Sequence, residues 1–272
     1  MRLLARQLDH EPVVVRERPF SRAVVRTLEV GAAGDAEWLV AIDADVLVLS
    51  DFVERARGLC ARMPSDAFCA TALTLCRVVG GLVFRGVHLY RASMLREALG
   101  LVDGLAPDLR PESAVQIAMS ERGHPKRFIA HAVGVHDHEQ YLRHLYLKAK
   151  LRARKDEERD AIAASLAARS ASDVDALVSS WGFADARTER DGPVEYDWGA
   201  AQPGFSRRLI GHGLLERDAL CEERADGLAE RALAAHDYRS DRVTAPWIRE
   251  RLRFEDGAPV ITEGLVLPGD GR

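Results

Sequence analysis

The fold depends on the stretch Trp38–Phe52, WLVAIDADVLVLSDF, which is apolar except for two aspartates near its centre and a Ser-Asp pair near its end. An ionised carboxylate is costly to bury without a partner, so Asp43 and Asp45 are not expected inside a closed core. A strand over residues 38–42 that ends just before them removes the conflict. The apolar residues can then be buried, while both aspartates emerge at the carboxyl end of the strand.

The composition is that of an ordinary globular protein, with 272 residues, 47% of them hydrophobic and 29% charged. This excludes a mostly disordered chain. The net charge of −4 gives no broad attraction to nucleic acid or an anionic membrane. No apolar run reaches the roughly 18 residues of a membrane span, and the charged start does not resemble a signal peptide. The four cysteines form no CxxC pair and suit a reducing compartment, so we expect a cytoplasmic protein.

Strand and helix signals alternate through the first half of the chain. Apolar runs predict strands, and amphipathic runs with capping or breaking residues at their ends predict helices. The predicted strands cover residues 12–16, 38–42, 68–75, 82–90 and 128–135. The predicted helices cover residues 22–30, which Ser21 would cap and which would end near Gly31, and residues 51–63, 92–99 and 111–123. This order predicts an α/β domain over residues 1–140, with a largely parallel sheet flanked by helices.

The second half, residues 141–272, is expected to be a helical extension packed on that domain. Residues 139–180 are rich in Ala, Leu, Arg and Glu and predict two or three helices. Residues 183–215 lack periodicity and are expected to be irregular, and helices are predicted again over 217–235 and 246–253. The basic run KAKLRARK is followed at once by acidic residues, which indicates a solvated helix face.

Asp43 and Asp45 together predict a metal site. In open α/β sheets the carboxyl ends of the strands form the ligand crevice. Mg²⁺ and Mn²⁺ prefer hard oxygen ligands, and they take one or two carboxylates together with substrate phosphates. The structural alternative is that each aspartate caps the following turn or pairs with an arginine. For two aspartates in this context we favour metal binding.

Four motifs in this order resemble those of GT-A glycosyltransferases, in particular the family-2-like enzymes with a DxD element. They are EWLVAIDADVLV at 37–48, GGLVFRGVHLYRASML at 80–95, RPESAVQIAMSERGHPKRFI at 110–129 and VGVHDHEQY at 133–141. The resemblance covers residues 12–150 and implies that the diphosphate of a nucleotide sugar binds through Mn²⁺ or Mg²⁺. One departure is that the usual first nucleotide-binding strand is lacking, because the first predicted strand here is PVVVR at 12–16.

The resemblance also implies roles for the residues that would bind the metal and the donor. Asp45 would hold the metal, with Asp43 close to both the metal and the ribose. His136 would be a later metal ligand, although the HDH sequence could equally present His138. Arg85, in a predicted strand, is a candidate to neutralise the diphosphate.

The general base is expected near the start of the helix that Pro111 opens. The resemblance favours Glu112, and Asp108 and Asp103 are the nearby competitors. A base removes a proton from the acceptor hydroxyl and must lie within hydrogen-bond reach of it. The plain alternative is that Glu112 only complements the dipole of the helix.

These features predict a metal-dependent glycosyltransferase that moves a sugar from a nucleotide-sugar donor to an acceptor hydroxyl, on a saccharide or another molecule. The sequence identifies neither donor nor acceptor, and it leaves a homo-oligomer open. One alternative is a catalytically inactive, transferase-like binding protein, which the lack of the first strand favours. The other is a haloacid-dehalogenase-like phosphatase, which also has DxD after an apolar strand but usually has Thr or Val where Leu47 stands.

Overall fold

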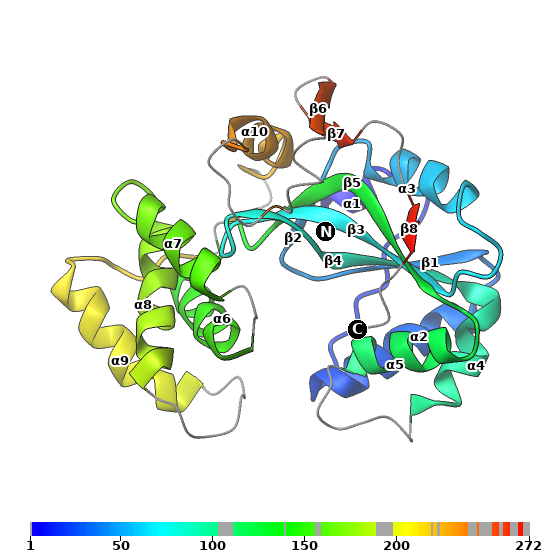
Figure 1. Ribbon diagram of the computed structural model, residues 1–272, viewed down its shortest axis with the longest axis horizontal. Coiled ribbons are helices and arrows are strands. Elements are labelled where there is room, and N and C mark those ends of the chain that lie inside the picture. The colour runs from blue at the N-terminus through cyan, green and yellow to red at the C-terminus, as the bar shows by residue number, and fades with distance from the viewer. Residues whose placement is uncertain are drawn as a thin grey trace.

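A computed structural model of the chain describes residues 2–102, 111–138, 140–155, 159–188, 198–218, 220–221, 224–238, 244, 252–255, 258–261 and 266–268. It shows an α/β fold in which helices flank a mixed sheet (Figure 1). The strands are β1 (Trp38–Ile42), β2 (Val46–Val48), β3 (Cys69–Cys76), β4 (Gly81–Arg91), β5 (Lys126–His136), β6 (Leu252–Glu255), β7 (Ala258–Ile261) and β8 (Val266–Pro268). The helices are α1 (Arg2–Ala5), α2 (Phe20–Ala33), α3 (Phe52–Ala61), the 3-10 turn η1 (Ala92–Met94), α4 (Leu95–Leu99), α5 (Pro111–Glu121), α6 (Leu142–Lys155), α7 (Arg159–Arg169), α8 (Val174–Thr188), α9 (Trp198–Gly211) and α10 (Leu228–Ala235).

The sheet is mostly antiparallel, so the prediction of a largely parallel sheet is wrong. Its strands follow the order β1-β4-β3-β5-β7-β6, and β2 and β8 also pair with β5. Among the described strands only β3 and β5 run parallel. The reason lies in the connection between β3 and β4, the short turn 77–80 that ends at Gly80 with φ 84°. Two strands joined by so few residues form a hairpin, because parallel neighbours need a long crossover.

Strand β5 is paired on both of its sides. Strand β3 follows one side of it from Lys126 to His136. Along the other side three short strands pair in succession, with β8 opposite residues 127–129, β7 opposite His131 and β2 opposite residues 134–136. Two of these three strands come from the last part of the chain. The second half of the sequence therefore contributes strands to the sheet as well as helices.

Helices cover both faces of the sheet. On one face α2, α4 and α5 lie together, with Leu28 and Met119 buried among them (Figure 1). On the other face α3 buries Phe52 and Leu59 against the strands, and α10 buries Leu233 beside them. None of the described helices is both long and apolar enough to cross a membrane.

Helices α6 to α9 form a lobe at one end of the sheet, on the left in Figure 1. Its core includes Tyr146, Leu166 and Phe205. Val78 and Val79, from the turn between β3 and β4, are buried in the same core. The hairpin turn thereby connects the helical lobe to the sheet.

Two predicted elements near the start of the chain differ from the structure. Residues 12–16 form no strand, and the side chains of Val13 and Val14 are 68% and 44% exposed. The run has β propensity, but no described strand pairs with it. Helix α2 continues through Gly31, where a Cβ would lie 2.6 Å from Leu95 Cδ1. This glycine permits close packing on α4 and does not end the helix.

The second half of the chain is only partly as expected. The helices predicted over 139–180 are present as α6, α7 and α8. Residues 183–215 were expected to be irregular, but they contain the end of α8 and all of α9. Burial of Phe205 overrides the weak local signal of a helix that contains Pro203. The helix predicted over 246–253 overlaps β6 (Leu252–Glu255), so its last two residues form part of a strand instead.

Candidate metal centre

The turn that follows β1 and the turn that follows β5 meet beside the middle of β4. The backbone N–H of Asp43 donates to the carbonyl of Gly86 in β4, with an N–O distance of 2.8 Å. The backbone N–H of Asp137 donates to the carbonyl of Asp45 over 3.1 Å. The first bond fixes the DxD turn against β4 and the second fixes it against the end of β5, although 91 residues lie between Asp45 and Asp137.

Gly86 makes this close approach sterically feasible. Its φ is 77°, in the left-handed region that glycine enters at little cost. A Cβ at this position would lie 2.7 Å from Val46 Cγ2 and 3.1 Å from His136 Cδ2. A larger residue would therefore push β2 and the His136 ring away from β4.

Three of the predicted site residues come together here. Asp43, Asp45 and His136 offer ligand atoms that all lie within 4.8 Å of one another. His136 Nε2 lies 3.3 Å from Asp45 Oδ1. His136 is buried and Asp43 is exposed, so the group extends from the interior to the surface. Of the two histidines in the HDH sequence, it is His136 that belongs to this group, and His138 does not.

Asp137 lies next to the ring nitrogen of His136 that does not face Asp45. Its carboxylate is fully buried, with Oδ2 3.0 Å from His136 Nδ1 and 3.4 Å from the Cys76 thiol, which donates to it. Its φ of 62° is a left-handed conformation that aspartate adopts more readily than most residues. A histidine that binds a metal commonly has a carboxylate at its other ring nitrogen. Asp137 lies at that nitrogen, although Nδ1 makes no hydrogen bond of acceptable geometry with it.

Helix α6 supplies two cations to the same carboxylates. Lys148 Nζ contacts both Asp45 Oδ2 and Asp137 Oδ1, and Arg152 Nη2 lies 3.4 Å from Asp137 Oδ2. Arg152 is only 7% exposed. The basic run was expected to form a solvated helix face, and that expectation is wrong for these two residues. Their side of α6 faces the turn after β5.

The charges in this cluster shift one another's pKa values. Burial alone would raise the pKa of Asp45, but the contact with His136 and the charges of His136 and Lys148 lower it well below its usual range. Burial alone would lower the pKa of His136, but Asp137 and Asp45 hold it well above its usual value. Although Asp43 as a residue is exposed, its carboxyl group lies within the cluster, where desolvation and the charge of Asp45 raise its pKa. The centre is thus a compact set of paired charges that could accept a cation or an anion by exchanging partners.

The other predicted site residues do not belong to this group of ligand atoms, and two of them lie outside the described residues. Arg85 precedes Gly86 in β4, and its carbonyl accepts a hydrogen bond from Thr74 Oγ1. Glu112 stands in the first turn of α5. Its carboxylate and that of Asp43 both add to the raised pKa of Tyr90, which burial chiefly causes.

Asp108 and Asp103, the competitors of Glu112 for the role of base, both lie outside the described residues. The assignment of the base therefore stays a prediction.

Asp137, Lys148 and Arg152 were not predicted to belong to the centre. Asp137 is the middle residue of a motif in which only the two histidines were considered. A signal for the other two exists in the helical spacing, because Lys148 and Arg152 follow the buried Leu145 at steps of three and four residues. Basic residues on the buried stripe of a helix need carboxylate partners.

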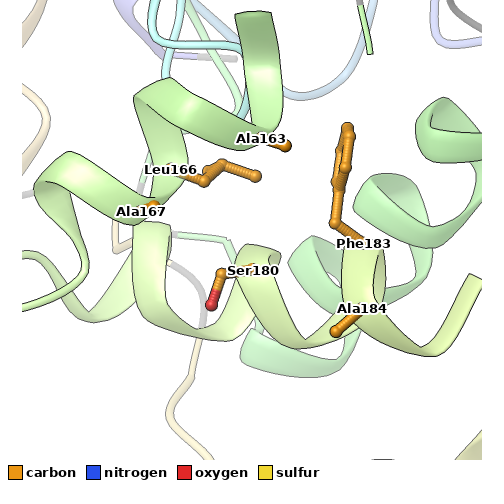
Figure 2. Close-up of a pocket in the computed structure, with 6 residues that line it drawn as sticks. All are labelled: Ala163, Leu166, Ala167, Ser180, Phe183 and Ala184. Atoms are coloured by element: carbon orange, nitrogen blue, oxygen red, sulfur yellow. The ribbon is translucent and has the colours of Figure 1, made fainter. Parts of the chain in front are cut away.

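An apolar cavity of about 200 Å³ lies apart from this centre, between α7 and α8 in the helical lobe (Figure 2). It is lined by Ala163, Leu166, Ala167, Ser180, Phe183 and Ala184. None of these side chains is charged. The cavity therefore offers no group for the chemistry that the carboxylate cluster could perform.

Comparisons with known proteins give no family by which the centre could be named. No family model matches the chain, and neither a curated protein nor a solved structure matches it. The function has to be argued from the residues of the centre.

Proposed function

We propose that the chain is a metal-dependent glycosyltransferase of the GT-A type, which transfers a sugar from a nucleoside-diphosphate sugar to an acceptor hydroxyl. The observation that carries the proposal is the meeting of Asp43, Asp45 and His136, with ligand atoms within 4.8 Å of one another. These residues come from two separate motifs of the resemblance. A divalent cation and a diphosphate are what such a cluster would bind in an enzyme of this kind.

The donor set suits Mn²⁺ or Mg²⁺. Two carboxylates and one imidazole are ligands that Mn²⁺ accepts, and Mg²⁺ favours the carboxylates. Asp45 Oδ1 is a buried oxygen that receives no hydrogen bond of acceptable geometry from the described residues. His136 Nε2 lies 3.3 Å from this oxygen without making such a bond, and a bound divalent cation would satisfy the oxygen directly. Asp137 Oδ2 lies 3.0 Å from the other ring nitrogen of His136, the side on which a metal-bound histidine commonly has a carboxylate, although that nitrogen makes no hydrogen bond of acceptable geometry with this carboxylate.

Cation binding, diphosphate binding and proton transfer would each depend on different residues of the chain. Asp45 and His136 would hold the cation, and Asp43 would lie beside it near the ribose. A bound cation would neutralise the charge that develops on the leaving diphosphate. Arg85 would contact the diphosphate, and Glu112 would take the proton of the acceptor hydroxyl.

An inactive, transferase-like binding protein is the second candidate. It is favoured by residues 12–16, which form no strand where enzymes of this type are expected to begin their nucleotide-binding sheet. Such a protein would still bind metal and nucleotide, but it would release no nucleoside diphosphate from a donor. Product release from UDP- and GDP-sugars therefore separates the two candidates.

The test is thermal unfolding with UDP, GDP, CMP and dTDP at 1 mM, each with and without Mn²⁺. We expect one nucleotide to raise the Tm by about 5 °C when Mn²⁺ is present and by much less without it, because a ligand stabilises the state that it binds. Asp45→Ala should abolish this shift. Asp35→Ala, which removes an exposed aspartate in the loop before β1, should keep it. An equal shift in Asp45→Ala and wild type would refute the metal centre.

A further inference from the structure

Lys148 is one of the two basic residues that helix α6 brings to the candidate centre. Its ammonium group contacts Asp45 and Asp137 at the same time. The chain has only four lysines, at 126, 148, 150 and 155, among 38 basic residues, and one of them lies here. The side chain is 20% exposed, so it reaches the cluster from its edge and has a path to solvent.

The ammonium group and a divalent cation would compete for the same carboxylate. A ligand–metal distance for Mg²⁺ or Mn²⁺ is about 2.1 Å, so a cation on Asp45 Oδ1, beside the oxygen that Lys148 contacts, would lie within roughly 6 Å of the present Nζ position. Two cations at that distance repel each other strongly where water is largely excluded. The carboxylate of Asp45 can therefore neutralise one of the two cations fully, but not both at once.

We propose that Lys148 is a built-in counter-ion of the centre, which a divalent cation must displace from Asp45 in order to bind. This inference rests on the proposed function, because it concerns the same metal centre. When Lys148 leaves Asp45, Asp137 keeps His136 and Arg152 as partners. The displaced ammonium then lies beside the metal, where a nucleotide diphosphate would place its negative charge.

Removal of Lys148 should therefore have opposite effects on the two ligands. Metal alone should bind more tightly, because it no longer has to displace a cation. A nucleoside diphosphate should bind more weakly in the presence of metal, because a cationic partner is lost. A lysine that only stabilises the fold would weaken both or affect neither.

The first experiment compares Mn²⁺ binding to wild type, Lys148→Met and Lys150→Met by the electron paramagnetic resonance of free Mn²⁺. We expect Lys148→Met to bind Mn²⁺ at least ten-fold more tightly than wild type. Lys150→Met is the matched control, since it removes the same charge from α6 at a residue whose charge acts on Asp185 in the helical lobe. It should bind like wild type, and so should Lys148→Arg, which keeps a cation.

The second experiment is a titration of the wild-type protein, and it uses variants only to assign the signals. In wild-type protein labelled with ¹³C-lysine, four ε-methylene signals are expected, and Lys→Arg substitutions assign them. Addition of Mg²⁺ should shift the Lys148 signal toward that of a free lysine and leave the Lys126 signal in place. The further addition of nucleoside diphosphate should shift the Lys148 signal again.

The outcomes separate this inference from the proposed function. If wild type binds Mn²⁺ through Asp45, but Lys148→Met binds it no more tightly and the Lys148 signal is unchanged by Mg²⁺, displacement is refuted and the metal centre stands. If neither wild type nor Lys148→Met binds Mn²⁺ at millimolar concentration, both are refuted. Tighter Mn²⁺ binding by Lys148→Met and an equal gain by Lys150→Met would reduce the effect to net charge, and this too would refute displacement.

Discussion

His131 shows how a single residue can carry a pH dependence for the whole protein. It lies in the middle of β5, where its Nε2 is 2.7 Å from Arg55 Nη1. Burial and the charge of Arg55 lower the pKa of His131 to about 4, from an ordinary value of 6.5. The imidazole therefore stays neutral in the folded protein and accepts a hydrogen bond from the guanidinium group.

The sign of the resulting pH dependence follows from this depressed pKa. Below pH 6.5 the unfolded chain protonates His131 while the folded protein does not, so stability is lost as the pH falls from 6.5 to about 4. We expect His131→Gln, which keeps an acceptor for Arg55 but does not titrate, to lose about 1–2 kcal/mol less than wild type between pH 7.5 and pH 5. Urea unfolding at both pH values measures the difference. Equal losses in the two proteins would contradict this assignment.

At the scale of the residue, the sequence predicts the parts of the centre that interrupt apolar runs. Asp43 and Asp45 stand out because a strand has no place for them in its core, and His136 because it ends another apolar run. Asp137 and Lys148 could not be found in this way. Their roles arise from the left-handed turn after β5 and from the face of α6 that meets it, and both are set by tertiary contacts.

At the scale of the element, the helical lobe depends on a close approach between α6 and α8. Gly182 in α8 lies against the backbone of α6, and a Cβ there would be 2.2 Å from the carbonyl oxygen of Tyr146. Backbone cannot move aside as the end of a side chain can. The spacing of these two helices is therefore set by this glycine.

Two Gly→Ala substitutions should consequently have opposite effects. We expect Gly182→Ala to lower the free energy of unfolding by about 1–3 kcal/mol, because it forces α6 and α8 apart. Gly58→Ala in α3 should raise it by up to about 1 kcal/mol, since the new Cβ would have only Arg62 Nη1 near it, at 3.6 Å, and alanine favours a helix. Chemical denaturation of both variants measures the two changes. A stabilised Gly182→Ala would show that the helices are not in tight contact.

Helices and strands with a strong local sequence pattern were predictable, but the elements against which they pair or pack were not. The runs that became β3, β4 and β5 were found within a few residues, as was α5 after Pro111. The direction of the strands was mistaken because the short link 77–80 was not read as a hairpin turn. Helix α9 was missed because it buries Phe205 through tertiary packing and has little periodicity of its own.

At the scale of the whole molecule, the last part of the chain supplies strands that complete the pairing of β5. Strands β7 and β8 pair with the side of β5 that β3 leaves open. Strand β6 extends this pairing through β7. Segments that are far apart in the sequence thus pair with the same strand, β5.

Removal of these strands should destabilise the sheet. We expect a chain that ends at residue 250 to have a lower Tm and to aggregate, because one side of β5 would offer unpaired backbone groups. A chain that ends at residue 268 keeps β6, β7 and β8 and is the control, with an expected Tm equal to that of the full chain. Static light scattering during heating follows both. Equal behaviour of the two shortened chains would show that the pairing adds little.

The shared side of β5 also has a consequence during synthesis on the ribosome. Strand β2 is synthesised before β5, so it can pair with residues 134–136 as soon as β5 leaves the ribosome. The partners of residues 127–131 are made only after the whole helical lobe. At a usual rate of translation this interval lasts on the order of ten seconds. The nascent chain must therefore be kept from pairing with other strands during this time, and a slowly translated message would lengthen the period in which chaperones are needed.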